Sequence, residues 1–199
     1  MKYTKFLIDN GIDFLSMKND ELEVVVTNYG CTIVKVLMKD KDFVKEHGYT
    51  RKQVVEILIK VCKGIEFLHS IGGFIGDLNG GNVLIRGTDV FIIDIDGMSF
   101  DDVKNCMYTN MYIYPPSAES GNITAQDDWY SLAVQSFYYL TYSHPFRGIS
   151  VFDSIPANET ERMKQGLSVL GEHHIMPPSI SIGWDFLPAS LTKYFLETF

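Results

Sequence analysis

Apolar residues recur at steps of three and four along residues 51–70, which is the spacing of one helix face. Thr50 is suited to cap the first turn, because its hydroxyl can accept from backbone N–H groups there, and Gly72-Gly73 favours a stop. The pattern therefore predicts a long helix over 51–70 whose inner face consists of Val54, Ile57, Leu58, Val61, Ile65 and Leu68.

Two short apolar runs follow, at 82–85 and 90–93, with Arg86-Gly87-Thr88-Asp89 between them. Apolar runs separated by turn-forming residues are typical of a β-hairpin. A further run at 22–27 is rich in β-branched residues and lies between turn residues, so it predicts a buried strand.

The rest of the chain predicts mostly helices. A second strong helix is expected from about Asp127 to a point before His144-Pro145, since Pro145 disfavours helix in the residue before it. Its inward residues would be Trp129, Leu132, Ala133, Phe137 and Leu140. Shorter helices are expected at 2–9, 159–170 and 189–199, and the stretch 101–126 is expected to be irregular. The predicted fold class is α+β, mainly helical, with a small hairpin.

Oxygen-bearing side chains mark one end of the predicted hairpin. Asp77 follows the long helix, Asn82 comes five residues later where a strand begins, and Asp94 stands where the return strand ends. A carboxylate can orient a hydroxyl nucleophile, and hard oxygen ligands bind the magnesium ions that bridge phosphates. Gly80 and Gly81 would let the backbone turn tightly. The alternative is that these residues only form turns, which Asp and Asn favour.

The order of these segments resembles the larger, C-terminal lobe of protein kinases. Leu68-His69-Ser70-Ile71-Gly72 through Asp77-Leu78 and Asn82-Val83-Leu84-Ile85 resembles the end of a helix and the catalytic loop after it. Ile93-Asp94-Ile95 resembles the strand and metal-binding Asp of the Asp-Phe-Gly element. Asp128-Trp129-Tyr130-Ser131-Leu132-Ala133-Val134, with His144-Pro145-Phe146, is similar to the helix whose leading Asp braces the catalytic loop. The resemblance covers roughly residues 20 to 199.

The resemblance implies a role for each matching residue. Asp77 would orient the acceptor hydroxyl, and Asn79 stands where a lysine usually lies near the transferred phosphate. Asn82 and Asp94 would hold magnesium, with Asp96 as the alternative to Asp94. The implied nucleotide contacts are Asn28, Tyr29, Asn82 and Leu84. Asp128 would support the loop, or would be an ordinary acid in the first turn of a helix.

Several elements of the family are changed. Ile75-Gly76-Asp77 replaces His-Arg-Asp, which removes the arginine that reads an activation-loop phosphate, and Pro115-Pro116-Ser117 replaces Ala-Pro-Glu. No Gly-x-Gly-x-x-Gly precedes Asp77. We therefore expect 1–30 to be a remnant of the nucleotide-binding lobe with its hinge, and 31–199 to be the kinase-like C-lobe. Lys35 is expected in a helix after that hinge. Three explanations stay open: a fragment, a lid supplied by another chain, or abandoned catalysis.

Composition narrows the partners and the location. The formal net charge of −8 argues against binding nucleic acid, which relies on Lys and Arg to displace counterions. We see no apolar run approaching the roughly 20 residues of a membrane span, nor a signal peptide, so a cytoplasmic location without membrane attachment is expected. Cys31, Cys62 and Cys106 are far apart and predict neither disulfides nor a zinc site.

These features favour a kinase that uses ATP and Mg²⁺ to phosphorylate Ser or Thr hydroxyls of a protein substrate. The chain by itself is expected to be incomplete, with a partner chain as the source of the missing N-lobe. Two other functions remain. The missing lid favours an inactive, pseudokinase-type binding or scaffold module. Gly76-Asp77-Leu78 with Asn82 also occurs in small-molecule kinases of the aminoglycoside or choline type, although the helix at Asp128 and the Pro145-Phe146 turn favour the protein-kinase branch.

Overall fold

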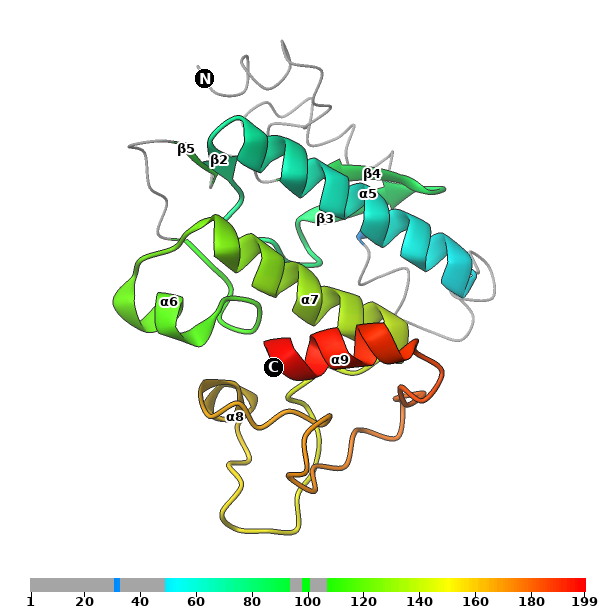
Figure 1. The fold of residues 1–199 in the computed structure, drawn as a ribbon, viewed down its shortest axis with the longest axis vertical. Coiled ribbons are helices and arrows are strands. Elements are labelled where there is room, and N and C mark those ends of the chain that lie inside the picture. The colour runs from blue at the N-terminus through cyan, green and yellow to red at the C-terminus, as the bar shows by residue number, and fades with distance from the viewer. Residues whose placement is uncertain (1–30, 33–48, 94–97, 101–106) are drawn as a thin grey trace.

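The computed structural model describes residues 31–32, 49–93, 98–100 and 107–199. Within these ranges the fold is α+β, as predicted, with helices α5 to α9 and two small antiparallel sheets. Helix α7 lies between α5 and α9 and forms the middle of the molecule (Figure 1). The predicted helix at 2–9, the predicted strand at 22–27 and Lys35 lie outside the described residues.

Helix α5 spans Arg51–Ser70, as predicted. Thr50 and Gln53 form a capping box: the Gln53 amide donates to the Thr50 hydroxyl at 3.3 Å, and the Thr50 amide donates to Gln53 Oε1 at 2.8 Å. The inner face is the predicted one, except that Leu58 is only half-buried. The helix therefore presents one continuous apolar stripe to the core.

The predicted hairpin is present as β3 (Val83–Arg86) and β4 (Asp89–Ile92). Gly87 in its turn has a φ of 60°, a conformation that favours glycine. Strand β1 (Cys31–Thr32) adds to β3, which gives the order β1-β3-β4. Side chains alternate between faces along β3, so Val83 and Ile85 enter the main core while Leu84 lies on the opposite face.

A second sheet joins β2 (Gly73–Phe74) to β5 (Ser99–Phe100). Gly73 is paired with Phe100, and a Cβ at Gly73 would lie 2.4 Å from the Phe100 ring and 2.9 Å from Leu68 Cδ1. Only glycine therefore allows this close approach. The sequence pattern predicted a stop at Gly72-Gly73, but it did not predict the sheet.

Helix α7 spans Ala125–Thr141 and begins two residues before its predicted start. The reason is that Thr124 is its N-cap, while Asp127 is the third residue of the first turn and accepts from the Thr124 amide at 2.8 Å. The helix ends before His144-Pro145, as predicted. Most of its residues are buried, although Trp129 and Leu132, both expected to point inward, are half-buried at the edge of the core.

Three further helices complete the described part. Helix α6 (Pro115–Ser120) lies in the stretch that was expected to be irregular. Its two prolines stand at the start of the helix, where their φ is already suitable and no N–H is needed. Helix α8 (Glu159–Lys164) ends well before Leu170, and Gly166 with a φ of 64° follows it. Helix α9 (Ala189–Thr198) agrees with its predicted range.

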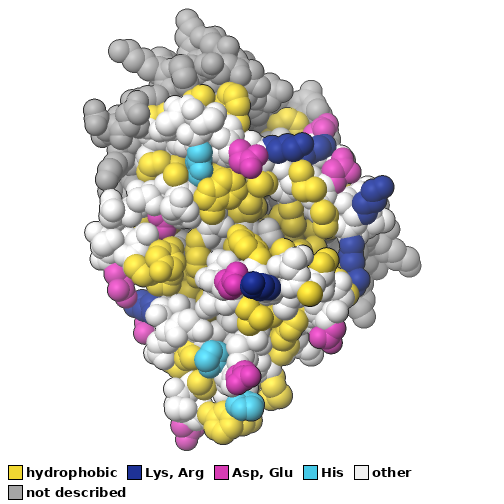
Figure 2. Space-filling model, in the orientation of Figure 1, with side chains coloured by type: hydrophobic (Ala, Val, Ile, Leu, Met, Phe, Trp, Pro, Cys, Tyr) yellow, Lys and Arg dark blue, Asp and Glu magenta, His cyan; other side chains and the backbone are white. Residues whose placement is uncertain are grey.

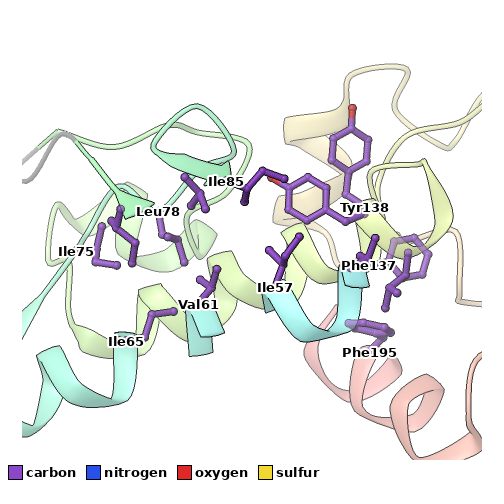
Figure 3. Close-up of a cluster of buried hydrophobic side chains, with 14 of the residues drawn as sticks. Ile57, Val61, Ile65, Ile75, Leu78, Ile85, Phe137, Tyr138 and Phe195 are labelled. Atoms are coloured by element: carbon purple, nitrogen blue, oxygen red, sulfur yellow. The ribbon is translucent and has the colours of Figure 1, made fainter. Parts of the chain in front are cut away.

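The main core lies where α5, α7, α9 and β3 meet. Figure 3 shows side chains from α5, from the loop after β2 and from α7 pointing into this region, with Phe195 of α9 at one end. The fully enclosed members include Ile65, Leu68, Leu78, Val83, Phe137 and Phe195. Leu78 belongs to the loop rather than to a helix or strand, so the loop is built into the core.

Apolar surface continues outside the core. Figure 2 shows hydrophobic side chains gathered over α5, α7 and α9, with acidic and basic side chains scattered around them. The large apolar residues of α5 and α9 that are exposed are Val55, Ile59, Phe67, Tyr194 and Leu196. None of the described helices combines the length and the apolar character needed to cross a membrane.

Candidate functional site

Residues 75–82 form a loop that leads from β2 into the hairpin, and its base is fixed by burial. The side chains of Ile75 and Leu78 are 3% and 0% exposed. Gly76 between them has a φ of 76°, which a residue with a Cβ rarely adopts. The next residue is Asp77, so its position is determined by the packing on both sides of it.

Asp77 is half-buried, and one of its oxygens is held by the backbone of another segment. Thr109 donates its amide N–H to Asp77 Oδ1 at 2.8 Å. No residue in the described ranges donates a hydrogen bond to Asp77 Oδ2. The carboxylate is thus fixed through one oxygen, while the other can accept a proton from a bound hydroxyl.

Asn82 is joined directly to Asp77. Its Nδ2 donates to the Asp77 carbonyl oxygen at 3.0 Å. Because this bond uses the NH₂ end of the amide, the Oδ1 end is the one available as a ligand. Ile93 donates its amide to the Asn82 carbonyl at 2.9 Å, so the residue that precedes Asp94 lies beside Asn82. Asp94 and Asp96 lie outside the described residues.

Asn79 shapes the loop from within. Its Oδ1 accepts from the Gly81 amide at 2.8 Å, and its Nδ2 lies 3.3 Å from Thr109 Oγ1 and 3.4 Å from the Asp77 carbonyl oxygen. A Cβ at Gly81 would lie 2.9 Å from Asn79 Oδ1, which explains the glycine. In this arrangement both ends of the Asn79 amide contact protein; its predicted role near a phosphate stays a prediction.

Leu84 was predicted to contact a nucleotide. It is 6% exposed, and it lies on the face of the hairpin opposite to Val83 and Ile85. It therefore lies apart from the main core cluster, and its contact with a nucleotide stays a prediction. The other predicted nucleotide contacts, Asn28 and Tyr29, lie outside the described residues.

Asp128 on α7 holds the first part of the loop. Its Oδ2 accepts from the Ile75 amide and its Oδ1 from the Gly76 amide, both at 2.8 Å. His69 Nε2 lies 2.9 Å from Oδ2, and the His69 ring meets Trp129 edge-on at 5.3 Å between centroids. The Asp128 side chain is fully buried. This carboxylate satisfies two backbone donors that would otherwise have no water to bind.

Further polar residues on the same face of α7 were not singled out from the sequence. Ser131 donates to the Tyr112 carbonyl at 2.6 Å, and Gln135 donates to the Leu78 carbonyl at 2.9 Å. Tyr139 donates to Gln135 Oε1 at 3.2 Å. We call Asp128, Ser131, Gln135 and Tyr139 the polar stripe. Its signal in the sequence is polar residues at helical spacing within an otherwise apolar helix.

The segment 107–113 is fastened next to the loop at several points. Besides Thr109 and Tyr112, Met111 accepts at its carbonyl from His144 Nε2, at 2.9 Å. His144 Nδ1 accepts from the Phe146 amide at 3.4 Å, so the ring is neutral in this arrangement. Burial lowers the pKa of His144 to about 4, against the partial opposing effect of the Met111 hydrogen bond. The segment is therefore held by both α7 and the turn that follows it.

A pocket of about 190 Å³ lies beside this segment. Residues on both sides of Thr109 contribute to it, together with α6 and α8. Its lining consists of Tyr108, Asn110, Pro115, Ala118, Glu119, Thr160, Met163 and Lys164. The pocket is thus lined by the two chain neighbours of Thr109, whose amide binds Asp77.

Potential metal ligands are sparse in the described ranges. No group of three or more His, Cys, Asp or Glu side chains there is placed to hold a metal ion. Cys62 carries a reduced thiol whose pKa is raised by burial and by Glu66.

No model of a known protein family matches the sequence, and comparison with curated proteins gives no match either. A function can therefore be proposed only from the loop and its surroundings.

Proposed function

We propose that this chain is a protein-kinase-like phosphotransferase that moves the γ-phosphate of ATP to a Ser or Thr hydroxyl. The observation that carries the proposal is the pairing of Asp77 and Asn82. Asp77 keeps one oxygen for a hydroxyl, and the Asn82 amide is bonded to the Asp77 backbone, so both groups are held together at one end of the hairpin. Phosphoryl transfer requires mainly such positioning and charge stabilisation.

Each residue has a chemical role in the proposal. Asp77 Oδ2 orients the acceptor hydroxyl and accepts its proton as the new bond from oxygen to the γ-phosphorus forms, while the bond from that phosphorus to the β–γ bridging oxygen breaks and ADP leaves. Asn82 Oδ1 is a hard oxygen donor that suits Mg²⁺, and Asp94 or Asp96 would complete the ligand set. Magnesium and ATP, when bound, supply the phosphoryl group and part of its charge neutralisation.

The anchoring of the loop supports a catalytic role over a mere connection between β2 and β3. A connecting loop needs no buried carboxylate, because surface loops are satisfied by water. Here Asp128 and Gln135 are both nearly or fully buried, and both are used to hold the loop's backbone. These buried polar groups restrict the position of Asp77, which is the residue that would take part in phosphoryl transfer.

The pocket next to Thr109 supports a protein acceptor. A polypeptide whose hydroxyl reaches Asp77 would pass close to this pocket and could place a neighbouring side chain in it. A small acceptor such as an amino alcohol would have no use for a pocket outside the reacting centre. We further propose that a partner chain supplies the missing N-lobe and covers the nucleotide.

The proposal is tested by incubating the purified chain with γ-labelled ATP and Mg²⁺. The acceptors are a peptide library with a single Ser or Thr per peptide and, separately, kanamycin and choline. The assay is run with the chain alone and with the proteins encoded beside it. We expect transfer to peptides, reduced about 100-fold or more by Asp77→Asn, which removes the proton acceptor. Asp153→Asn, at an exposed carboxylate, is the matched control.

Three results would contradict the proposal in different ways. Equal transfer by the wild type and Asp77→Asn would remove Asp77 from the chemistry. Transfer to kanamycin or choline but not to peptides would indicate a small-molecule kinase. No transfer, together with no heat of MgATP binding in calorimetry, would indicate a scaffold module.

A further inference from the structure

Gln135 contacts the residue that follows Asp77. Its Nε2 donates to the Leu78 carbonyl at 2.9 Å and lies 3.3 Å from the Ser131 carbonyl. The Gln135 side chain is 2% exposed, and the side chain of Leu78 is fully enclosed. Water therefore cannot replace this donor, so the Leu78 carbonyl depends on Gln135.

The Leu78 carbonyl, which can only accept, selects the nitrogen end of the Gln135 amide, and Tyr139 holds the oxygen end. The two ends of a glutamine amide have nearly the same shape, but only the nitrogen can donate to a carbonyl. Tyr139 donates its hydroxyl to Gln135 Oε1 at 3.2 Å, which leaves Nε2 directed to Leu78. Burial raises the pKa of Tyr139 well above its ordinary value, so the hydroxyl keeps its proton. The pair is thus a relay of two hydrogen bonds with a defined direction.

The relay and Asp128 hold the loop on both sides of Asp77. Asp128 binds the amides of Ile75 and Gly76, and Gln135 binds the carbonyl of Leu78. Residues 128 and 135 are seven apart on one helix, so they lie on the same face two turns apart. Asp77 is the residue between these two attachments, and it is the one whose carboxylate faces Thr109.

We propose that Gln135, oriented by Tyr139, is a positioning residue that fixes the backbone at Leu78 and thereby the carboxylate of Asp77. This inference rests on the proposed phosphotransfer for its effect on rate. Its effect on the loop itself is independent of that function. Gln135 does not touch the acceptor or the phosphate in this account, and it acts only through the loop.

The test compares Gln135→Leu, Tyr139→Phe and the double variant with the wild type. Tyr138→Phe is the matched control, because Tyr138 is a neighbouring buried tyrosine whose ring packs without joining the relay. Amide hydrogen exchange is followed by mass spectrometry on peptides from 73–82 and, separately, from α5. Phosphotransfer is measured as kcat and as KM for MgATP. Thermal unfolding gives Tm for each protein.

We expect Gln135→Leu to increase exchange in 73–82 by about tenfold while α5 is unchanged, and to lower kcat by about tenfold at constant KM for MgATP. Tyr139→Phe should give a smaller change in the same direction and serves if Gln135→Leu does not fold. The double variant removes both relay partners together, so its Tm should recover toward the wild type. Exchange and kcat should not recover with it, because the Leu78 carbonyl still lacks its donor.

Exchange and kcat that follow Tm in every variant would overturn the inference and leave Gln135 a purely structural residue. Wild-type exchange in Gln135→Leu would overturn it as well. Failure of the proposed function looks different: the wild type itself transfers no phosphate, while the exchange measurements still decide whether Gln135 holds the loop.

Discussion

His144 is a buried histidine that joins the turn after α7 to the segment beside the loop. Both ring nitrogens are used, by the Met111 carbonyl and the Phe146 amide. Protonation would put a second N–H where Nδ1 now accepts, and would place a charge in a buried site. The single residue therefore makes the anchoring of this segment sensitive to acid.

We predict that His144 makes the protein less stable as pH falls from about 6.5 to about 4. The pKa of His144 is lowered in the folded state, so the unfolded chain binds a proton there that the folded protein does not. Its stabilising contribution is complete above the unfolded pKa of 6.5 and declines by about 1.4 kcal/mol per pH unit below it. Urea unfolding at pH 7, 6 and 5 measures this slope.

His144→Gln removes the titration while keeping a side-chain amide that can donate. Its unfolding free energy should fall less steeply between pH 6.5 and 5 than that of the wild type. His174→Gln, at an exposed histidine, should leave the wild-type slope unchanged. The same slope in all three proteins would show that His144 does not titrate differently on folding.

Single residues also show the limit of prediction from sequence. Asp77 and Asn82 could be placed together because their spacing and the turn chemistry around them are local. Gln135 could not be assigned, because a glutamine in a helix usually faces solvent, and its partner Leu78 is 57 residues away in sequence. Its role depends on the backbone carbonyl of Leu78. Because every residue has a backbone carbonyl, the sequence does not indicate which one a side chain will bind.

At the scale of elements, α7 organises the candidate site. Its polar stripe faces the loop and the segment 107–113, while the rest of its buried surface packs against α5 and α9. The helix thus provides packing and hydrogen-bonding partners from one rigid element. A site that is supported by a helix is held more precisely than one on a mobile loop.

We predict that Asp128→Ala lowers the free energy of unfolding by about 3 kcal/mol or more. The substitution leaves the buried amides of Ile75 and Gly76 without an acceptor, and each such loss costs about 1–3 kcal/mol. Asp128→Asn keeps one acceptor oxygen and should lose less. Urea denaturation gives both values. Gln126→Ala, exposed on the same helix, is the control, and a comparable loss there would contradict the prediction.

Long elements were predicted better than short ones. Helix α5 and the hairpin have strong local periodicity, so their positions agree with the sequence pattern. Helix α6 and the β2–β5 sheet consist of few residues and carry no repeating pattern of their own. They form because α8 and α5 are beside them, and that information is tertiary.

At the scale of the molecule, the loop and the pocket lie on either side of Thr109. The Asp77 carboxylate binds the Thr109 amide, and Tyr108 and Asn110 line the pocket. Helices α6 and α8 close the other side of the pocket. The arrangement connects a reacting centre with a surface that a longer acceptor could contact.

We predict that Ala118→Phe, which adds a large ring to the pocket lining, raises KM for the best peptide of the library by about tenfold, because it takes the space of one acceptor side chain. The rate of ATP hydrolysis without peptide should be unchanged, since the Asp77 loop is not altered. Steady-state kinetics at varied peptide concentration measures both. Glu172→Gln, at an exposed site elsewhere on the chain, is the control. An unchanged KM would show that acceptors do not use the pocket.

The close contact of Gly73 with Phe100 restricts how this sequence can vary. The pair lies where the chain enters the loop and where it returns after the hairpin. A methyl group at position 73 has no space unless the ring at position 100 is replaced by something smaller. In an alignment of related chains these two positions should consequently change together. Covariation between them would mark proteins in which the strand before the loop pairs with the strand after the hairpin in the same way.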